Sequence, residues 1–327
     1  MAEEETIGVV LLNMGGPDTL EDVEPFLLGL FSDRQIIRLS PFPFLQKFIA
    51  RRIARSRAPK SREAYRLIGG GSPQKRLTLA QGEALAAVLA PAGSFRVDMA
   101  MRYWSPRAEE TLREMAAAGI RRLVALSLYP HFSKATGGSS LADLKRAAAV
   151  CGHPFEIAEI SSWPEAPRYV ECLAADISRG LATFPDNGET VVVYSAHSLP
   201  VKFIDEGDPY LDHLRATIAA VEARTGVGGR LCFQSRSGPV QWLRPSTPEM
   251  LEQLAGEGFR QVLMVPISFV SDHVETLYEI DILYREQAAA LGLRLVRTEG
   301  LNARPEFIAA LGELVLERCR RQNWLTH

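Results

Sequence analysis

The segment GIRRLVALSLYP (residues 119–130) decides the fold, because the segment GFRQVLMVPISF (residues 258–269) repeats its pattern in the second half of the chain. Each segment begins with a glycine, an apolar residue and an arginine, and then runs into apolar residues. A glycine at this point is typical of the end of a helix. Apolar runs without strict alternation are typical of parallel strands covered on both faces. The two segments therefore predict two similar α/β units.

The rest of the chain follows the same repeat, with one interruption. Residues 95–103 resemble residues 229–237 at nearly the same offset, whereas the first strand resembles the strand ending near Ser195 at an offset larger by roughly 40 residues. An insertion within residues 25–72 accounts for the difference. The alternative is that any two halves of a doubly wound sheet look this similar. We expect strands over residues 8–12, 96–101, 122–128, 190–194, 230–234 and 261–267, and helices over residues 78–89, 108–118, 208–225, 247–256 and 305–322.

Composition narrows the class of protein. With 327 residues, 46% of them apolar and 23% charged, the chain has an ordinary globular composition and enough length for two domains. A formal net charge of −2 gives no electrostatic reason to expect a nucleic-acid partner. No apolar run reaches the roughly 18–20 residues of a membrane-spanning helix, so any membrane contact would be peripheral. Four scattered cysteines without a CxxC pair, and an acidic start (residues 1–6) without an apolar signal core, favour a reducing, cytoplasmic location.

The insertion has an unusual composition. Two strongly apolar segments, PFLLGLF (residues 25–31) and PFPFLQKFI (residues 41–49), precede a basic stretch that extends to Arg66. Apolar surface edged with arginines suits a flat apolar ligand that carries carboxylates. A helix docked on its own domain with a solvated basic face has the same composition, and composition alone favours this second interpretation.

A histidine follows one predicted strand. The segment SAHSLP (residues 195–200) places His197 just beyond the strand over residues 190–194. In open α/β sheets, ligands bind outside the carboxyl ends of the strands, so the position is suited to chemistry. A structural histidine remains the more common explanation of such a residue.

A second such segment, SDHVETLYE (residues 271–279), follows the strand over residues 261–267. The spacing of Asp272, Glu275 and Glu279 predicts three carboxylates on one helical face. An imidazole and several carboxylates would suit a divalent first-row metal that is held weakly and passed on. Solvent alone could equally neutralise the acidic face.

Two glycine-rich segments do not carry a nucleotide site. IGGGSP (residues 68–73) and NMGGP (residues 13–17) lack the spacing of the dinucleotide and P-loop fingerprints. A nicotinamide-dependent enzyme is therefore disfavoured.

Seven segments, in order over nearly the whole chain, resemble the ferrochelatase family. They are LLNMGGP (residues 11–17), YRLIGGGSP (65–73), MRY (101–103), YSAHSLP (194–200), GDPY (207–210), FQS (233–235) and SDHVETLYE (271–279). The resemblance implies an α/β fold of two Rossmann-like, chelatase-type domains, with parallel sheets flanked by helices and a porphyrin cleft between them. Residues 1–168 would form the first domain with a porphyrin-covering lip at about residues 25–72, residues 169–302 the second, and residues 303–327 a helix returning to the first.

The resemblance implies an activity and its site residues. The enzyme would be a lyase that inserts ferrous iron into protoporphyrin IX, releases two protons and forms protohaem, the last step of haem biosynthesis. His197 and Glu275 would act on the metal and the protons from opposite sides of the macrocycle, and Asp272, His273 and Glu279 would form an acidic path to Glu275. Substrate-binding residues would be Met14, Ser72, Arg102, Tyr103, Trp242, Phe269 and, near a propionate, Arg57.

Departures from the family pattern refine these expectations. Met14 stands where the coproporphyrin-using branch commonly carries tyrosine, and Ser105 stands where many members have histidine. Some members hold a [2Fe–2S] cluster on one internal and three C-terminal cysteines. Cys172 lies near the internal position, but Cys319 is the only cysteine in the C-terminal tail. We therefore expect no cluster and no other bound cofactor. The expected partners are porphyrin and ferrous iron, with peripheral membrane contact through the lip and no obligate protein partner. Competing hypotheses are a cobalt or nickel tetrapyrrole chelatase and a non-catalytic porphyrin or haem carrier.

Overall fold

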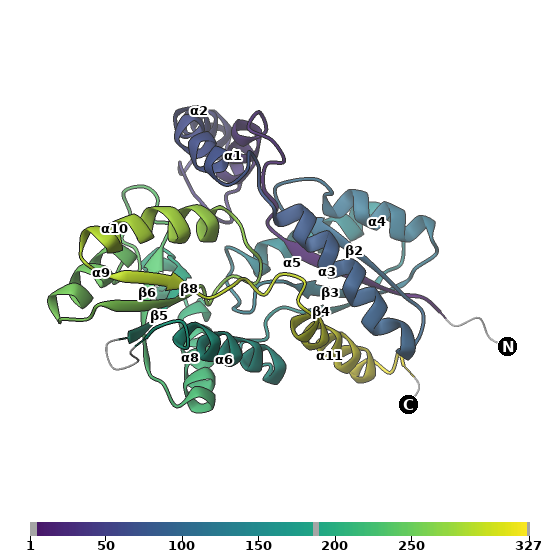
Figure 1. Cartoon of the computed structure of the whole chain (residues 1–327). Coiled ribbons are helices and arrows are strands. Elements are labelled where there is room, and N and C mark those ends of the chain that lie inside the picture. The colour runs from purple at the N-terminus through teal and green to yellow at the C-terminus, as the bar shows by residue number, and fades with distance from the viewer. Residues whose placement is uncertain (1–4, 186–189, 326–327) are drawn as a thin grey trace. The chain divides into compact units, whose positions relative to one another are not determined.

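The structure is a computed structural model that describes residues 5–185 and 190–325. The chain divides into two compact units (Figure 1), Met1–Trp163 with Asn302–His327, and Pro164–Leu301. The acidic segment predicted at residues 1–6 lies outside the described residues except for Glu5 and Thr6.

Each unit is built on a four-stranded parallel sheet. The first sheet has the order β2-β1-β3-β4, from β1 (Ile7–Asn13), β2 (Phe95–Met101), β3 (Arg122–Ser127) and β4 (Glu156–Ile160). The second has the order β6-β5-β7-β8, from β5 (Thr190–His197), β6 (Gly229–Gln234), β7 (Gln261–Val265) and β8 (Arg294–Arg297). Numbered within its own unit, each sheet reads 2-1-3-4. The predicted fold class of two similar α/β units is confirmed.

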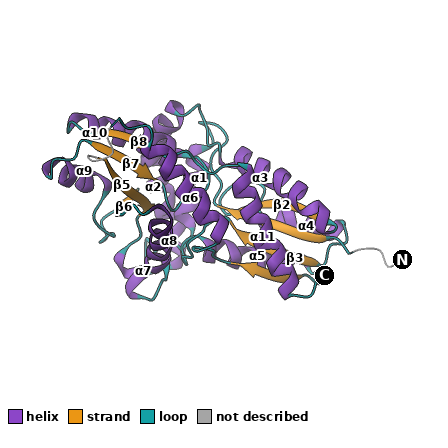
Figure 2. Cartoon of the chain, turned by 60° about the horizontal axis from the view of Figure 1, so that its bottom comes forward, coloured by secondary structure: helices purple, strands orange, loops and turns teal. Residues whose placement is uncertain are grey.

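Helices flank the strands of both sheets (Figure 2). The first unit contains α1 (Val23–Ser32), α2 (Pro43–Leu67), α3 (Gln74–Leu89), the short helix η1 (Ala90–Ala92), α4 (Ala108–Ala117), α5 (Gly137–Cys151) and α11 (Pro305–Arg321). The second contains α6 (Pro167–Leu181), α7 (Val201–Asp205), α8 (Tyr210–Thr225), α9 (Thr247–Gly256), the π-helix η3 (Glu275–Tyr284) and α10 (Arg285–Ala290).

The repeated glycines end equivalent helices in the two units. Gly119 follows α4 with φ +74° and Gly258 follows α9 with φ +95°, values that favour a residue without a Cβ. The next residue reaches back in the same way in both cases, because Ile120 N donates to Met115 O at 3.1 Å and Phe259 N donates to Leu254 O at 3.1 Å. The strands that follow, β3 and β7, are buried almost throughout.

The final helix packs on the first unit, as expected. A Cβ added to Gly312 of α11 would lie 2.8 Å from Val88 Cγ1 of α3, so a larger residue there would force the two helices or the Val88 side chain to shift. Beyond the helix, Trp324 Nε1 donates to Glu156 Oε1 of β4 at 3.2 Å. Among the helices of the described ranges, none has the length and apolar composition needed to cross a bilayer.

The insertion folds as a helix pair formed by α1 and α2. Small residues of α2, among them Ala50, Ala54 and Ala58, are buried on one face, whereas its arginines lie mostly on the other. Three aromatic side chains at the start of α2 are exposed, namely Phe42, Phe44 and Phe48 with 56%, 77% and 63% of their surface accessible. The insertion therefore combines a docked helix with an apolar tip that its own unit does not cover.

Candidate active site

His197 and Glu275 contact each other directly. His197 is the last residue of β5, and Glu275 is the first residue of η3, which follows the neighbouring strand β7. The carboxyl ends of neighbouring parallel strands meet at one edge of the sheet, which brings the two segments together. His197 Nδ1 lies 2.8 Å from Glu275 Oε2. The expectation that the two side chains face each other across a macrocycle is wrong, because a hydrogen bond of this length leaves no room for a ring between them.

The carboxylate changes the proton affinity of the imidazole. Burial opposes a positive charge on His197, but the Coulombic attraction and the hydrogen bond of Glu275 outweigh burial and raise the pKa of His197. In the same way, burial opposes the negative charge of Glu275, but the His197 imidazole lowers the pKa of Glu275 well below its ordinary value. The pair is therefore a base whose conjugate acid is stabilised by a fixed neighbouring charge.

Two polar residues at the end of β6, Gln234 and Ser235, join Glu275 to Glu279. Gln234 Nε2 donates to Glu275 O at 2.8 Å and to Glu279 Oε2 at 3.0 Å. Ser235 Oγ lies 2.8 Å from Glu275 Oε2 and 2.7 Å from Glu279 Oε2. A hydroxyl has one proton and can donate to only one of these oxygens, so a proton on Glu279 would supply the donor for the second hydrogen bond. Burial, followed by the charge of Glu275, raises the pKa of Glu279 to about 7.

We expect Glu279→Gln to flatten the decrease in stability between pH 5 and pH 8. A carboxyl whose pKa is higher in the folded state than in the unfolded chain binds more protons when folded, so the free energy of unfolding falls as the pH rises through the interval between the two values. Glutamine has the same shape and no charge to lose, which should remove roughly 1–3 kcal/mol of that decrease. Urea unfolding at both pH values tests this, with the exposed Glu286→Gln as the control. A slope equal to that of the parent protein would show that Glu279 does not titrate there.

His273 is a neutral neighbour of this pair. Its Nε2 lies 4.0 Å from Glu275 Oε1, and its Nδ1 lies 3.0 Å from Ser271 O. The Phe269 ring meets it edge to face, with 4.6 Å between centroids. Burial lowers the pKa of His273, so the imidazole is uncharged near neutral pH.

Asp272 has a different partner from the other two carboxylates. The predicted face of three carboxylates is wrong, because Asp272 precedes the helix and because Glu275–Tyr284 is a π-helix, whose wider turn changes the periodicity. Asp272 Oδ1 accepts a hydrogen bond from Arg297 Nη1 at 2.9 Å. The Arg297 side chain is only 10% exposed and also forms a bidentate pair with Asp281 at 2.9 and 2.7 Å. The charge of Asp272 is thus offset by an arginine of β8.

Three predicted substrate-binding residues lie together in the first unit. Arg102 N donates to Asn13 O at 2.8 Å and Tyr103 N donates to Met14 O at 2.9 Å, which continues the pairing of β1 and β2 past their ends. Met14, Arg102 and Tyr103 therefore occupy one sheet edge. Ser72 follows on the loop before α3, where its N donates to Pro17 O at 2.7 Å.

The remaining predicted residues lie elsewhere on their own units. On α2, the Arg57 guanidinium lies 5.7 Å from the centroid of the Phe31 ring. In the second unit, Trp242 forms an isolated antiparallel bridge with Pro200, three residues after His197. Trp242 is therefore placed next to the segment that carries the histidine.

Sequence reasoning assigned no role to Asp33, Gln234, Ser235 or Arg297. Gln234 is the last residue of β6, beside β5, and Ser235 follows it. Both belong to the segment FQS (residues 233–235), which was the signal that could have drawn attention to them. Within the described ranges, no three His, Cys, Asp or Glu side chains are grouped to hold a metal ion.

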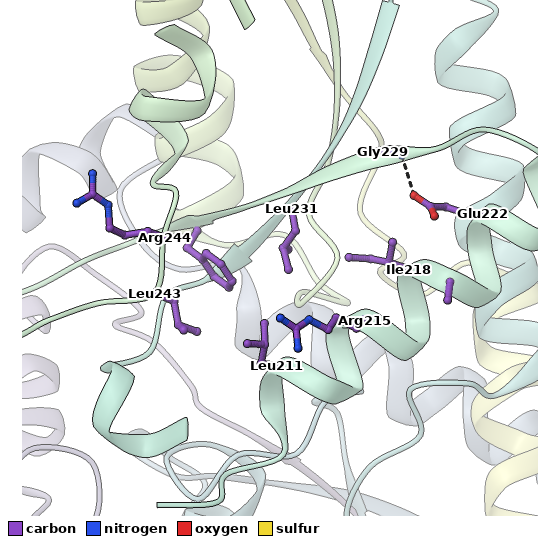
Figure 3. Close-up of a pocket in the computed structure, with 10 residues that line it drawn as sticks. Leu211, Arg215, Ile218, Glu222, Gly229, Leu231, Leu243 and Arg244 are labelled. Carbon is purple, nitrogen blue, oxygen red and sulfur yellow. Dashed lines mark hydrogen bonds between the residues drawn. The ribbon is translucent and has the colours of Figure 1, made fainter. Parts of the chain in front are cut away.

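A pocket of about 430 Å³ lies on another part of the second unit, between α8, β6 and the segment at Leu243 and Arg244. Leu211, Ile218 and Leu231 line it together with Arg215 (Figure 3). None of the predicted site residues belongs to its lining.

Comparisons with known proteins agree with one another. The family model described as Ferrochelatase matches residues 6–319. A ferrochelatase of Desulfotalea psychrophila is 57% identical over 311 residues, which cover 95% of this chain and 96% of that protein. One of Geotalea uraniireducens is 53% identical over 313 residues, with 95% and 97% covered. SirB from Bacillus subtilis, solved with Fe3+, has a TM-score of 0.57 at 11% identity and covers 98% of this chain and 100% of its own, a likeness of fold alone.

Proposed function

Because this chain belongs to the ferrochelatase family, and so is a lyase-class enzyme that inserts ferrous iron into a porphyrin in haem biosynthesis, we propose that His197 and Glu275 remove the porphyrin protons from one side of the ring. The hydrogen bond of 2.8 Å between the two side chains carries this proposal. Iron and porphyrin are both substrates of the reaction.

The proton transfers can be written with atoms balanced. A free-base porphyrin loses two pyrrole protons when a divalent ion takes their place. Neutral His197, with its Nδ1 proton donated to Glu275, has a lone pair on Nε2 that can accept one pyrrole proton. Once a proton has left the pair for solvent by way of Glu279, the imidazole is neutral again and can accept the second pyrrole proton. The imidazolium that forms is stabilised by the adjacent carboxylate. Distortion of the flat ring, which exposes its nitrogens, would draw on binding energy from the remote parts of the macrocycle.

We infer that Glu279 receives protons from this pair on their way to solvent. Its pKa of about 7 allows it to take up and release a proton near neutral pH. Ser235 touches both carboxylates and can relay between them. His273, itself uncharged, would add no second positive charge beside the pair, and Asp272, held by Arg297, would fix the turn that precedes Glu275.

Further side chains would bind the porphyrin. In the first unit these are Met14, Ser72, Arg102 and Tyr103, with Arg57 directed to a propionate. In the second unit, Trp242 and Phe269 would supply aromatic surface. The metal would be bound transiently by His197 and Glu275.

We propose protoporphyrin as the preferred porphyrin, on the basis of Met14. The thioether is apolar and suits vinyl groups, whereas a tyrosine hydroxyl would suit a more polar ring. We expect iron insertion into protoporphyrin to be at least about tenfold more efficient than insertion into coproporphyrin, and Met14→Tyr to narrow this ratio. Initial rates with each porphyrin measure it, with Co²⁺ and a sirohydrochlorin as the control for the related chelatase chemistry. Equal rates with the two porphyrins would contradict the assignment.

The apolar tip of the insertion supports peripheral membrane contact. Phe42, Phe44 and Phe48 are exposed beside Lys47 and Arg51, a combination that suits an anionic bilayer surface. Each phenylalanine fully inserted into lipid would contribute roughly 1.5–3 kcal/mol. Phe44→Ser with Phe48→Ser should reduce cosedimentation with vesicles of phosphatidylglycerol and phosphatidylethanolamine at least about tenfold. Val150→Ser, at a 71% exposed apolar residue of α5, is the matched control, and equal losses in both variants would contradict the proposal.

A further inference from the structure

Asp33 accepts hydrogen bonds from several side chains at the point where α1 ends. Its Oδ2 atom lies 2.5 Å from Arg102 Nη2, 2.7 Å from the Tyr103 hydroxyl and 3.3 Å from Ser139 Oγ. Its Oδ1 atom accepts from Gln35 N at 2.8 Å, which fixes the backbone at the entry to the following loop. The Asp33 side chain is only 9% exposed. One carboxylate therefore connects three elements of the first unit.

We propose that Asp33 is a positioning residue that sets the orientation of Arg102 and Tyr103 for porphyrin binding and links this orientation to the α1–α2 insertion. The proposal rests on the proposed role of Arg102 and Tyr103 as substrate-binding residues. Asp33 itself would act through these two side chains.

The largely buried positive charge of Arg102 needs the carboxylate of Asp33 as a partner. The Arg102 side chain is 17% exposed, and a guanidinium at that depth needs an anionic partner. Asp143 Oδ1 lies 3.5 Å from Arg102 Nη1, but it also pairs with Arg146 at 2.7 Å. Asp33 is thus the closer of the two carboxylates to Arg102.

The three side chains that donate to Asp33 also contact one another. Arg102 Nε donates to Ser139 Oγ at 2.8 Å, so the serine lies between the guanidinium and the carboxylate. The guanidinium also lies 5.1 Å from the centroid of the Tyr103 ring. Burial, and after it the charge of Asp33, raises the pKa of Tyr103, which keeps the phenol protonated as a donor. A change at Asp33 would therefore move both neighbours together.

The test is an equilibrium titration of the whole protein with iron-free protoporphyrin, followed by steady-state kinetics. We expect Asp33→Asn to raise the porphyrin Kd and KM roughly tenfold to a hundredfold, because charge-assisted hydrogen bonds to a buried arginine are lost. The kcat at saturating porphyrin should stay within about twofold, and Asp33→Glu should recover part of the affinity. Asp22→Asn removes the same charge at the exposed start of α1 and should leave the Kd unchanged.

A double-mutant cycle separates positioning from a general structural role. If Asp33 acts through Arg102 and Tyr103, Asp33→Asn should change the Kd less than about twofold in a background that carries both Arg102→Gln and Tyr103→Phe. An effect of Asp33→Asn that is independent of this background and additive with it would overturn the proposal, as would an unchanged Kd in Asp33→Asn alone.

A second variant and the absence of iron from the titration allow the proposal to be tested even if the first variant fails. Should Asp33→Asn fail to fold, Ser139→Ala removes only the bridging hydroxyl and should raise the Kd about threefold to tenfold, and an unchanged value would overturn the proposal. Because the titration contains no iron, it reports on Asp33 even if the assignment of His197 and Glu275 is incorrect.

Discussion

His197→Ala is expected to reduce iron insertion by at least roughly 10³-fold while leaving the porphyrin Kd within about twofold of its original value. The imidazole is the one side chain of the site whose neutral form can accept a pyrrole proton and whose charged form has a carboxylate at 2.8 Å to stabilise it. Alanine leaves Glu275 without that partner, and water would have to carry the protons instead. The His197 side chain is 37% exposed, so its removal should not create an empty buried cavity.

Two measurements make this result interpretable. Anaerobic initial rates of Fe²⁺ insertion report the loss of proton transfer, and porphyrin fluorescence quenching reports binding. His153→Ala in the first unit, whose Nε2 contacts Ile120 O, is the matched control and should insert iron at near the normal rate. A near-normal rate in His197→Ala would remove the imidazole from the mechanism.

Glu275→Gln is expected to lower turnover by roughly 10²-fold or more and to move the acid limb of the pH–rate profile to lower pH. The attraction of Glu275 raises the pKa of His197 against the effect of burial. An uncharged amide leaves burial to dominate, and the pKa of His197 should then fall. The base form would persist to lower pH, but the weaker base would take the pyrrole proton more slowly.

The pH shift is the part of this prediction that a general structural defect would not produce. Rates at saturating iron and porphyrin across pH 5 to 9 would locate the acid limb in both proteins. The control is Glu286→Gln, an exposed substitution on α10 with the same change in charge. If turnover in Glu275→Gln equals that of the parent protein, the carboxylate has no part in proton removal.

Much of the fold could be predicted from the sequence because the central strands have strong local signals. β1, β3 and β7 are apolar runs, and β3 and β7 each begin shortly after a helix-ending glycine. The edge strands β4 and β8 were not predicted. EIAEI has charged residues at two of five positions, and RLVR is only four residues long. Such strands depend on pairing with a neighbour rather than on their own hydrophobicity.

The sequence indicated which residues belong to the candidate site better than it indicated how they are arranged. The sequence placed His197 and Glu275 after strands of one sheet, but a spacing pattern does not reveal that η3 is a π-helix or that two side chains meet at hydrogen-bond distance. Contacts such as the one between Asp33 and Arg102 join segments far apart in the chain. The spacing of residues along the sequence does not predict which distant side chain such a residue will contact.

The identical strand order of the two halves places Asn13 and His197 at corresponding ends of β1 and β5. Asn13 is 4% exposed, and its amide is engaged by Thr78 and Gln74. That amide does not change its protonation state near neutral pH, whereas an imidazole such as that of His197 can. At equivalent places in two sheets of the same order, one half thus carries a rigid hydrogen-bonded amide and the other carries a side chain that can take up and release protons.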